Sequence, residues 1–232
     1  MYYSSGYGLY MLFALPALLL GMWAQYKVKS SYKKFAGIPL RNGMTGAEVA
    51  RHILNDKGLH EVKVEETSGT LSDHYDPRTR TLKLSSGVYR SNSVSAAGVA
   101  AHEAGHAIQH KEKYGPLNLR SIMVPSVQMG SWLGPILFFI GIIMASDTLA
   151  IAGLLFFAAT AVFAIVTVPV ELNASKRAKA ILAGSGLTYS TEMAGVDQVL
   201  NAAALTYVAG AAQVLSTLLY YAFILLGNRR RS

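Results

Sequence analysis

Long apolar blocks alternate with polar segments along the chain. Residues 1–26 and 198–228 carry no charged side chain, and residues 121–170 carry only Asp147. A helix needs about 20 apolar residues to cross the core of a bilayer. Each block is long enough for at least one crossing. The pattern therefore indicates a mainly α membrane protein.

The lengths of the blocks predict about four transmembrane helices. One span is expected near residues 8–25 and the last near residues 205–226. The middle block is long enough for two spans, which we expect within residues 128–170 with a tight turn at residues 146–148. About 100 residues after the first span are polar enough to lie in water.

The polar region after the first span is predicted to fold as a small α+β unit. Residues 45–48 have the form of a capping box, which predicts a helix that ends at Gly58. Residues 61–65 and 79–84 alternate between polar and apolar side chains, which predicts two strands. We expect one buried face on each of these elements.

An Ala-rich helix is predicted over residues 96–111, with Ser93 or Ser95 as its N-cap, and it contains His102-Glu103-Ala104-Gly105-His106. Two histidines four residues apart differ by about 40° in direction, so both can bind one ion. Glu103 lies beside them as a candidate base. The alternative is a surface helix with solvated histidines, which the apolar neighbours disfavour. The motif predicts the zinc site of a hydrolase.

A catalytic zinc ion keeps three protein ligands and an open position, so a third ligand is needed. Glu112 would point about 120° away from His106 on the same helix. His110 follows His106 by four residues, but three such residues rise too far along one helix to close a tetrahedron. The third ligand is therefore expected from another segment. The chain has no cysteine, so it must be His, Asp or Glu.

Glu171 is the best candidate for the third ligand. Two predicted spans separate it from His106, and an even number of crossings returns the chain to the same side of the membrane. The alternative is that Glu171, just after Pro169, only stabilises a helix N-terminus. Glu192 and Asp197 are the other carboxylates considered.

The net charge is +8, with 21 Lys and Arg against 13 Asp and Glu. The basic residues gather beside the first and last spans, at Lys27, Lys29, Lys33, Lys34, Arg41, Arg229, Arg230 and Arg231. Such clusters favour the cytoplasmic side and anionic lipid, so we expect lipid contacts and no nucleic-acid partner. If residues 27–125 are cytoplasmic, a complete fourth crossing would place the three terminal arginines outside the cell, against the charge rule. Three explanations are open: the last segment is not a simple crossing, the tail is exported despite its charge, or the orientation of the whole protein is inverted.

Five strings together resemble the YugP-type membrane-bound neutral zinc metallopeptidases, over almost the whole chain. They are Asp73-His74-Tyr75-Asp76-Pro77, Leu82-Lys83-Leu84-Ser85, residues 99–109, Pro169-Val170-Glu171-Leu172-Asn173-Ala174-Ser175 and Ala204-Leu205-Thr206-Tyr207-Val208. More distantly, the chain resembles the HtpX and CAAX-prenyl-protease gluzincins, whose third ligand is a glutamate on a later helix.

The resemblance implies zinc held by His102, His106 and Glu171, with Glu103 as catalytic base. It also implies a sheet edge beside the site that pairs with an extended peptide. The HtpX group has an aspartate at the position of Ser175, four residues after the glutamate ligand.

Two further residues are candidates for the oxyanion or the substrate. His74 and Tyr207 are chosen only because they lie in strings that resemble the family. The strand at residues 81–85 is a candidate for holding substrate by β-augmentation.

The predicted function is a membrane-embedded zinc endopeptidase that hydrolyses peptide bonds with a zinc-activated water and Glu103 as general base. The alternatives are an inactive zinc-binding scaffold or chaperone-like adaptor, and a transporter, which the nearly charge-free spans disfavour. Zn²⁺ is the expected cofactor, and the substrate is expected to be a peptide or a membrane protein.

We expect a multi-pass protein of the bacterial plasma membrane with a cytoplasmic active site. The predicted division is an N-terminal anchor (1–26), a zinc peptidase domain (27–125), a transmembrane hairpin (126–170), a third-ligand helical segment (171–204) and a C-terminal transmembrane helix with a basic tail (205–232).

Overall fold

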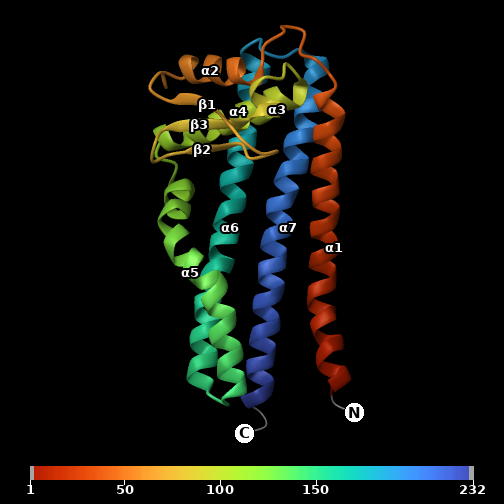
Figure 1. The fold of residues 1–232 in the computed structure, drawn as a ribbon, viewed down its shortest axis with the longest axis vertical. Helices are drawn as coiled ribbons and strands as arrows, with labels where there is room; N and C mark the ends of the chain where they lie inside the picture. The colour runs from red at the N-terminus through yellow and green to blue at the C-terminus, as the bar shows by residue number, and fades with distance from the viewer. Residues whose placement is uncertain (1–2, 230–232) are drawn as a thin grey trace. The chain divides into compact units, whose positions relative to one another are not determined.

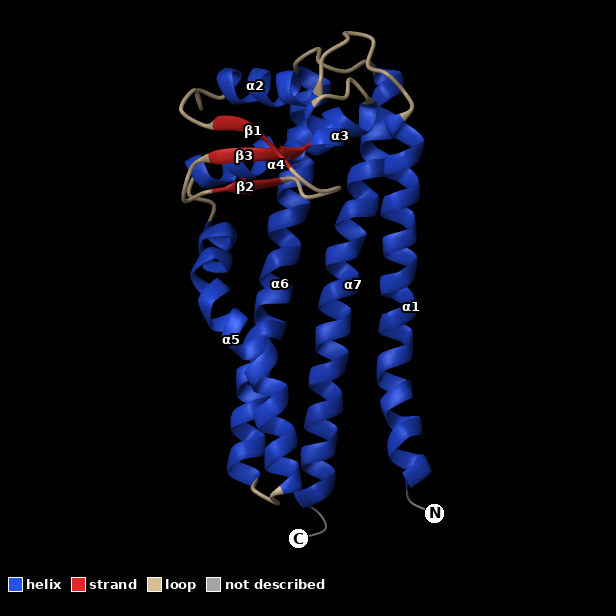
Figure 2. Cartoon of the chain, in the orientation of Figure 1, coloured by secondary structure: helices blue, strands red, loops and turns tan. Residues whose placement is uncertain are grey.

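The structure is a computed structural model and describes residues 3–229. Within these residues the helices are α1 (Tyr3–Ala36), α2 (Gly46–Asp56), α3 (Ser86–Tyr89), α4 (Val94–Lys111), α5 (Gly115–Ile143), α6 (Asp147–Gly184) and α7 (Ser190–Arg229). The strands are β1 (Lys63–Thr67), β2 (His74–Asp76) and β3 (Thr81–Ser85). Figure 2 shows how far helix dominates over strand. The predicted class, mainly α with a small α+β part, is confirmed.

Four helices in the described residues are long and apolar enough to cross a membrane. They comprise Tyr10–Ala36, Gly115–Ile143, Asp147–Gly184 and Ser190–Gly227. These helices are longer than the predicted spans because their polar ends stay helical. The last is continuous, and Arg230 and Arg231 of the basic tail lie outside the described residues.

Helix α6 continues through Pro169 to Gly184, although a proline removes one backbone hydrogen bond. Glu171 therefore lies 24 residues into a helix that begins at Asp147 and not in a first turn. The interpretation of Glu171 as a residue that only stabilises a helix N-terminus is wrong, because the exposed amides of the first turn are far from it.

The chain forms two compact units. The first consists of Met1–Ala24, Leu119–Val168 and Thr206–Ser232, and the second consists of Gln25–Asn118 and Pro169–Leu205. The apolar helical segments make up the first unit. The second unit contains the sheet, α2, α3 and α4, and the last turns of α6.

Close backbone contacts hold the first unit together. A Cβ atom at Gly153 would lie 2.3 Å from the backbone nitrogen of Phe138, so only glycine lets α5 and α6 approach so closely. Phe138 also stacks on Tyr221 of α7, with ring centroids 4.5 Å apart. Small residues at such contacts are typical of helices packed in membranes.

The sheet of the second unit has the order β1-β3-β2, with β3 parallel to β1 and antiparallel to β2 (Figure 1). Strand β2 has only three residues, too few to give an alternating pattern, and the sequence did not predict it. Because β3 is paired on both sides, it offers no edge to a peptide. The prediction that residues 81–85 hold substrate is therefore wrong, and the edge strands are β1 and β2.

The predicted capping box begins α2. The Thr45 hydroxyl accepts a hydrogen bond from the Glu48 amide, and the Glu48 carboxylate accepts one from the Thr45 amide. The helix ends at Asp56, and Gly58 follows with a φ of +62°, a left-handed conformation that suits glycine. The prediction for this helix is confirmed.

Helix α4 runs through the core of the second unit. Its N-cap is Ser93, whose hydroxyl accepts a hydrogen bond from the Ala96 amide. Small side chains along the helix let the neighbouring elements pack closely around it. The fully buried ones are Ala96, Ala97, Ala100, Ala101, Ala104 and Ala107. Polar side chains on this helix are consequently buried as well, and they include the motif residues.

Candidate metal centre

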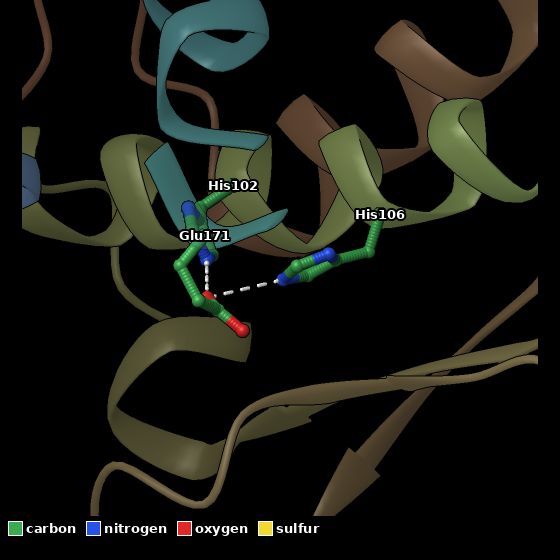
Figure 3. A group of neighbouring side chains, drawn as sticks. All are labelled: His102, His106 and Glu171. Atoms are coloured by element: carbon green, nitrogen blue, oxygen red, sulfur yellow. Dashed lines mark hydrogen bonds and ion pairs between the residues drawn. The ribbon is translucent and has the colours of Figure 1, made fainter. Parts of the chain in front are cut away.

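Three buried side chains from two helices converge in the second unit. His102 and His106 come from α4, and Glu171 comes from α6. Nε2 of His102 lies 3.1 Å from Oε2 of Glu171, and Nε2 of His106 lies 3.4 Å from the same oxygen. Figure 3 shows both imidazoles directed at this carboxylate. One ligand atom of each residue lies within 4.8 Å of the others.

This donor set fits a divalent metal ion. Two imidazoles and one carboxylate are the protein ligands of several catalytic zinc sites, which leave a further position open. Glu171 is only 2% exposed, whereas His102 and His106 keep 9% and 8% exposure. A buried carboxylate is costly unless it is paired or binds a metal.

Gly105 brings the two helices into contact. A Cβ atom at this position would lie 2.8 Å from the carbonyl oxygen of Ala174 on α6. Gly105 stands between the two histidines in the sequence, and Ala174 lies one helical turn after Glu171. The close contact therefore occurs beside the converging side chains, and it explains why a glycine is placed within the motif.

Comparison with known proteins identifies the family. Residues 10–226 match the family described as "Putative neutral zinc metallopeptidase". The chain belongs to this family. It is 46% identical over 221 residues to the "Putative membrane protease YugP" of Bacillus subtilis (strain 168), covering 95% of this chain and 98% of that protein. No solved structure matches. The resemblance to the YugP-type neutral zinc metallopeptidases that the sequence indicated is confirmed.

Each histidine of the converging group has a partner for its other ring nitrogen. Nδ1 of His102 lies 3.1 Å from the hydroxyl of Ser175, and Nδ1 of His106 lies 2.9 Å from Oε1 of Gln109. Such partners orient metal-binding imidazoles. The partner of His102 is therefore a serine hydroxyl, and the partner of His106 is a side-chain amide.

Glu103 is buried beside the histidines, with 8% exposure. Burial raises the pKa of the Glu103 carboxyl above its ordinary value, and the nearby His102 and His106 act against this rise. A bound cation would add a further positive charge and favour the ionised form. The ionised form is the one that can accept a proton as a general base.

The other carboxylates considered as a third ligand lie in different interactions. Glu192 accepts hydrogen bonds from the backbone amides of Arg41 at 2.8 Å and Tyr189 at 2.7 Å. Asp197 pairs with Lys179 at 3.1 Å. Neither belongs to the converging group, so of the carboxylates considered it is Glu171 that the structure brings to the histidines.

The two candidates for the oxyanion or the substrate are not part of the group either. His74 on β2 is exposed, and its Nδ1 lies 2.8 Å from the carbonyl oxygen of Ser72. Tyr207 belongs to the first unit and is 36% exposed. Their roles stay predictions.

His110, which the sequence places one turn after His106, does not reach the group. Its Nδ1 lies 2.9 Å from the hydroxyl of Tyr75 on the edge strand β2. This contact joins β2 to the helix that carries the motif.

Sequence reasoning gave no role to Gln109 or Asn173. Gln109 lies three residues after His106, a spacing at which helical side chains are neighbours. This spacing could have indicated a contact with the histidine. The contact of Gln109 with Asn173 joins residues 64 positions apart and has no local signal.

Proposed function

We propose that this protein is a membrane-embedded zinc endopeptidase that uses Glu103 as its general base. The observation that carries the proposal is that the imidazoles of His102 and His106 both point at one carboxylate oxygen of Glu171. Glu103 is buried next to them, and the chain belongs to a family described as zinc metallopeptidases. His102, His106 and Glu171 would hold the metal.

The roles follow from the chemistry of the side chains. Bound zinc would polarise the scissile carbonyl and lower the pKa of a water molecule. Glu103 would accept the proton of that water and deliver it to the leaving amine. Ser175 and Gln109 would orient the imidazoles. No general base other than Glu103 is needed.

The substrate is proposed to be an extended peptide or an unfolded segment of a membrane protein. Extended peptides bind proteins by adding a strand to the edge of a sheet. Of the two edge strands, β2 contacts the motif helix through Tyr75 and His110. We therefore propose that β2 is the edge that pairs with the substrate.

The proposed location is the bacterial plasma membrane, with the active site on the cytoplasmic side and anionic lipid at the basic residues. Four candidate membrane helices support a multi-pass arrangement. The similar protein of Bacillus subtilis is also named a putative membrane protease. Lys27, Lys29 and other basic residues follow the first apolar segment, which favours the cytoplasm for the polar region.

The first experiment separates hydrolysis from metal binding. Purified wild type in detergent should contain zinc and cleave an unfolded protein substrate. Glu103→Gln should keep the zinc and lose cleavage, because the amide accepts no proton. Cleavage by Glu103→Gln at the wild-type rate would refute the assignment of the base. Zinc binding without cleavage in wild type would instead support an inactive scaffold or chaperone-like adaptor.

The second experiment tests the third ligand. Glu171→Ala should lose most of the bound zinc. Glu192→Gln is the matched control. Glu192 is also a buried glutamate of the second unit, but its carboxylate accepts hydrogen bonds from backbone amides. Full zinc content and activity in Glu171→Ala would show that the third ligand is another residue.

A further inference from the structure

We infer that Gln109 is a positioning residue of the metal centre. It fixes the tautomer of His106 and ties this histidine to the helix that carries Glu171. Gln109 is fully buried on α4, one helical turn after His106. A buried amide must satisfy all its polar atoms, so its contacts define its orientation. The inference rests on the proposed function of the centre.

A backbone carbonyl decides which way the Gln109 amide faces. Nε2 of Gln109 lies 2.9 Å from the carbonyl oxygen of Val170, which can only accept a hydrogen bond. The NH₂ group must therefore face Val170, and Oε1 must face Nδ1 of His106 at 2.9 Å. Since Oε1 only accepts, Nδ1 carries the proton. In the neutral imidazole, which is the form that binds a metal, the lone pair of His106 is then on Nε2, the atom directed at Glu171.

Ser175 does not give His102 the same restriction. A hydroxyl can donate or accept, so its 3.1 Å contact with Nδ1 is compatible with either tautomer of His102. The two histidines are therefore held in different ways. Only the contact with Gln109 imposes by itself the tautomer that metal binding at Nε2 requires.

The Gln109 amide also joins α4 to α6. Its second N–H donates to Oδ1 of Asn173 at 2.9 Å, and the same oxygen accepts a hydrogen bond from Nε of Arg177 at 2.7 Å. Arg177 in turn pairs with Glu112, the C-cap of α4, at 2.6 Å. The chain of contacts thus starts at a histidine on α4, crosses to α6 beside Glu171, and returns to the end of α4.

Two substitutions separate the tautomer role from simple packing. Gln109→Met has a similar length and no acceptor for His106. Gln109→Glu keeps an acceptor for Nδ1 but turns a second carboxylate oxygen toward Val170 and Asn173, which is unfavourable in a buried position. Gln109→Glu should therefore be the less stable of the two when metal-free. It should nevertheless bind zinc more tightly than Gln109→Met.

The measurement is the zinc affinity of full-length protein in detergent, by competition with a chromophoric chelator, alongside thermal unfolding of the metal-free protein. Gln109→Met should bind zinc about 10- to 100-fold more weakly than wild type. The visible spectrum of the Co²⁺-substituted protein should change as well, because one imidazole is no longer held. Thr188→Val is the control: it removes a buried hydroxyl that donates to Leu182 at 3.0 Å in the same unit, and should leave zinc affinity unchanged.

The results distinguish this inference from the proposed function. The inference would be overturned if Gln109→Met bound zinc within twofold of wild type. It would also be overturned if Gln109→Glu, the less stable variant, bound zinc more weakly than Gln109→Met. In either case, wild type that binds zinc and an inactive Glu103→Gln would leave the proposed function standing. Wild type that binds no zinc would overturn both.

Discussion

Gly105 offers a sharp test of how closely the two ligand-bearing helices must approach. In Gly105→Ala, the new Cβ atom would lie 2.8 Å from the carbonyl oxygen of Ala174, whereas ordinary contact begins at 3.4 Å. The contact is with backbone, which no side-chain rotation relieves. The helices must therefore move apart by about 0.6 Å at the turn that follows Glu171.

A shift of this size is large for a metal site. Metal–ligand distances are held within about 0.2 Å, so the displaced Glu171 would no longer coordinate well. We expect zinc affinity to fall at least tenfold. Overpacking costs about 1–3 kcal/mol of stability, partly offset by up to about 1 kcal/mol from replacing a helical glycine by alanine. A tenfold loss of affinity corresponds to about 1.4 kcal/mol, which is similar to this net stability cost, so zinc affinity must be measured under conditions in which the metal-free protein stays folded.

Gly98→Ala is the matched control in the same helix. A Cβ atom there would meet Cγ1 of Val196 at 3.6 Å, an ordinary contact, so this change should stabilise the protein by up to about 1 kcal/mol and leave zinc binding unchanged. The assays are chelator competition and thermal unfolding of the metal-free proteins. Equal zinc affinity in Gly105→Ala and Gly98→Ala would refute the argument from helix contact.

Three further outcomes are expected. Ser175→Ala should weaken zinc binding by about tenfold, as measured by chelator competition, because His102 loses its partner at Nδ1, and an unchanged affinity would assign its orientation to packing. Removal of zinc with a chelator should lower the unfolding temperature, and zinc at about 100 times its Kd should raise the free energy of unfolding by about 2.7 kcal/mol. An unfolding temperature that does not depend on zinc would exclude a zinc site in the native fold. Thr45→Ala should cost about 1 kcal/mol in denaturant unfolding by removing the N-cap of α2, with no change in zinc content.

Local patterns in the sequence were enough to predict much of the fold. The capping box of α2 and the four apolar helices follow from side-chain spacing and hydrophobicity within one segment. For α4 the sequence left Ser93 and Ser95 as alternative N-caps, and the structure has Ser93. Strand β2 escaped prediction because three residues carry no periodicity. Its pairing with β3 depends on contacts across the sheet and not on its own sequence.

Helix α6 shows the limit of local signals. Its sequence contains Pro169, which favours a helix start or a kink, yet the helix is continuous from Asp147 to Gly184. The residues after Pro169 pack against α4 at Gly105, and this tertiary contact outweighs the lost hydrogen bond. The position of Glu171 within a helix followed from that packing.

Residue spacing alone placed His102 and His106 on one face of a predicted helix, with Glu103 beside them, because residues four positions apart in a helix differ by only about 40° in direction. The sequence favoured Glu171 as the third ligand over Glu192 and Asp197, but no local pattern places that side chain beside the histidines, and no role for Gln109 was predicted. Only the tertiary structure brought Glu171 to His102 across 69 residues of chain. Such an approach depends on how closely two helices pack, which the small residue at position 105 permits and no local pattern encodes.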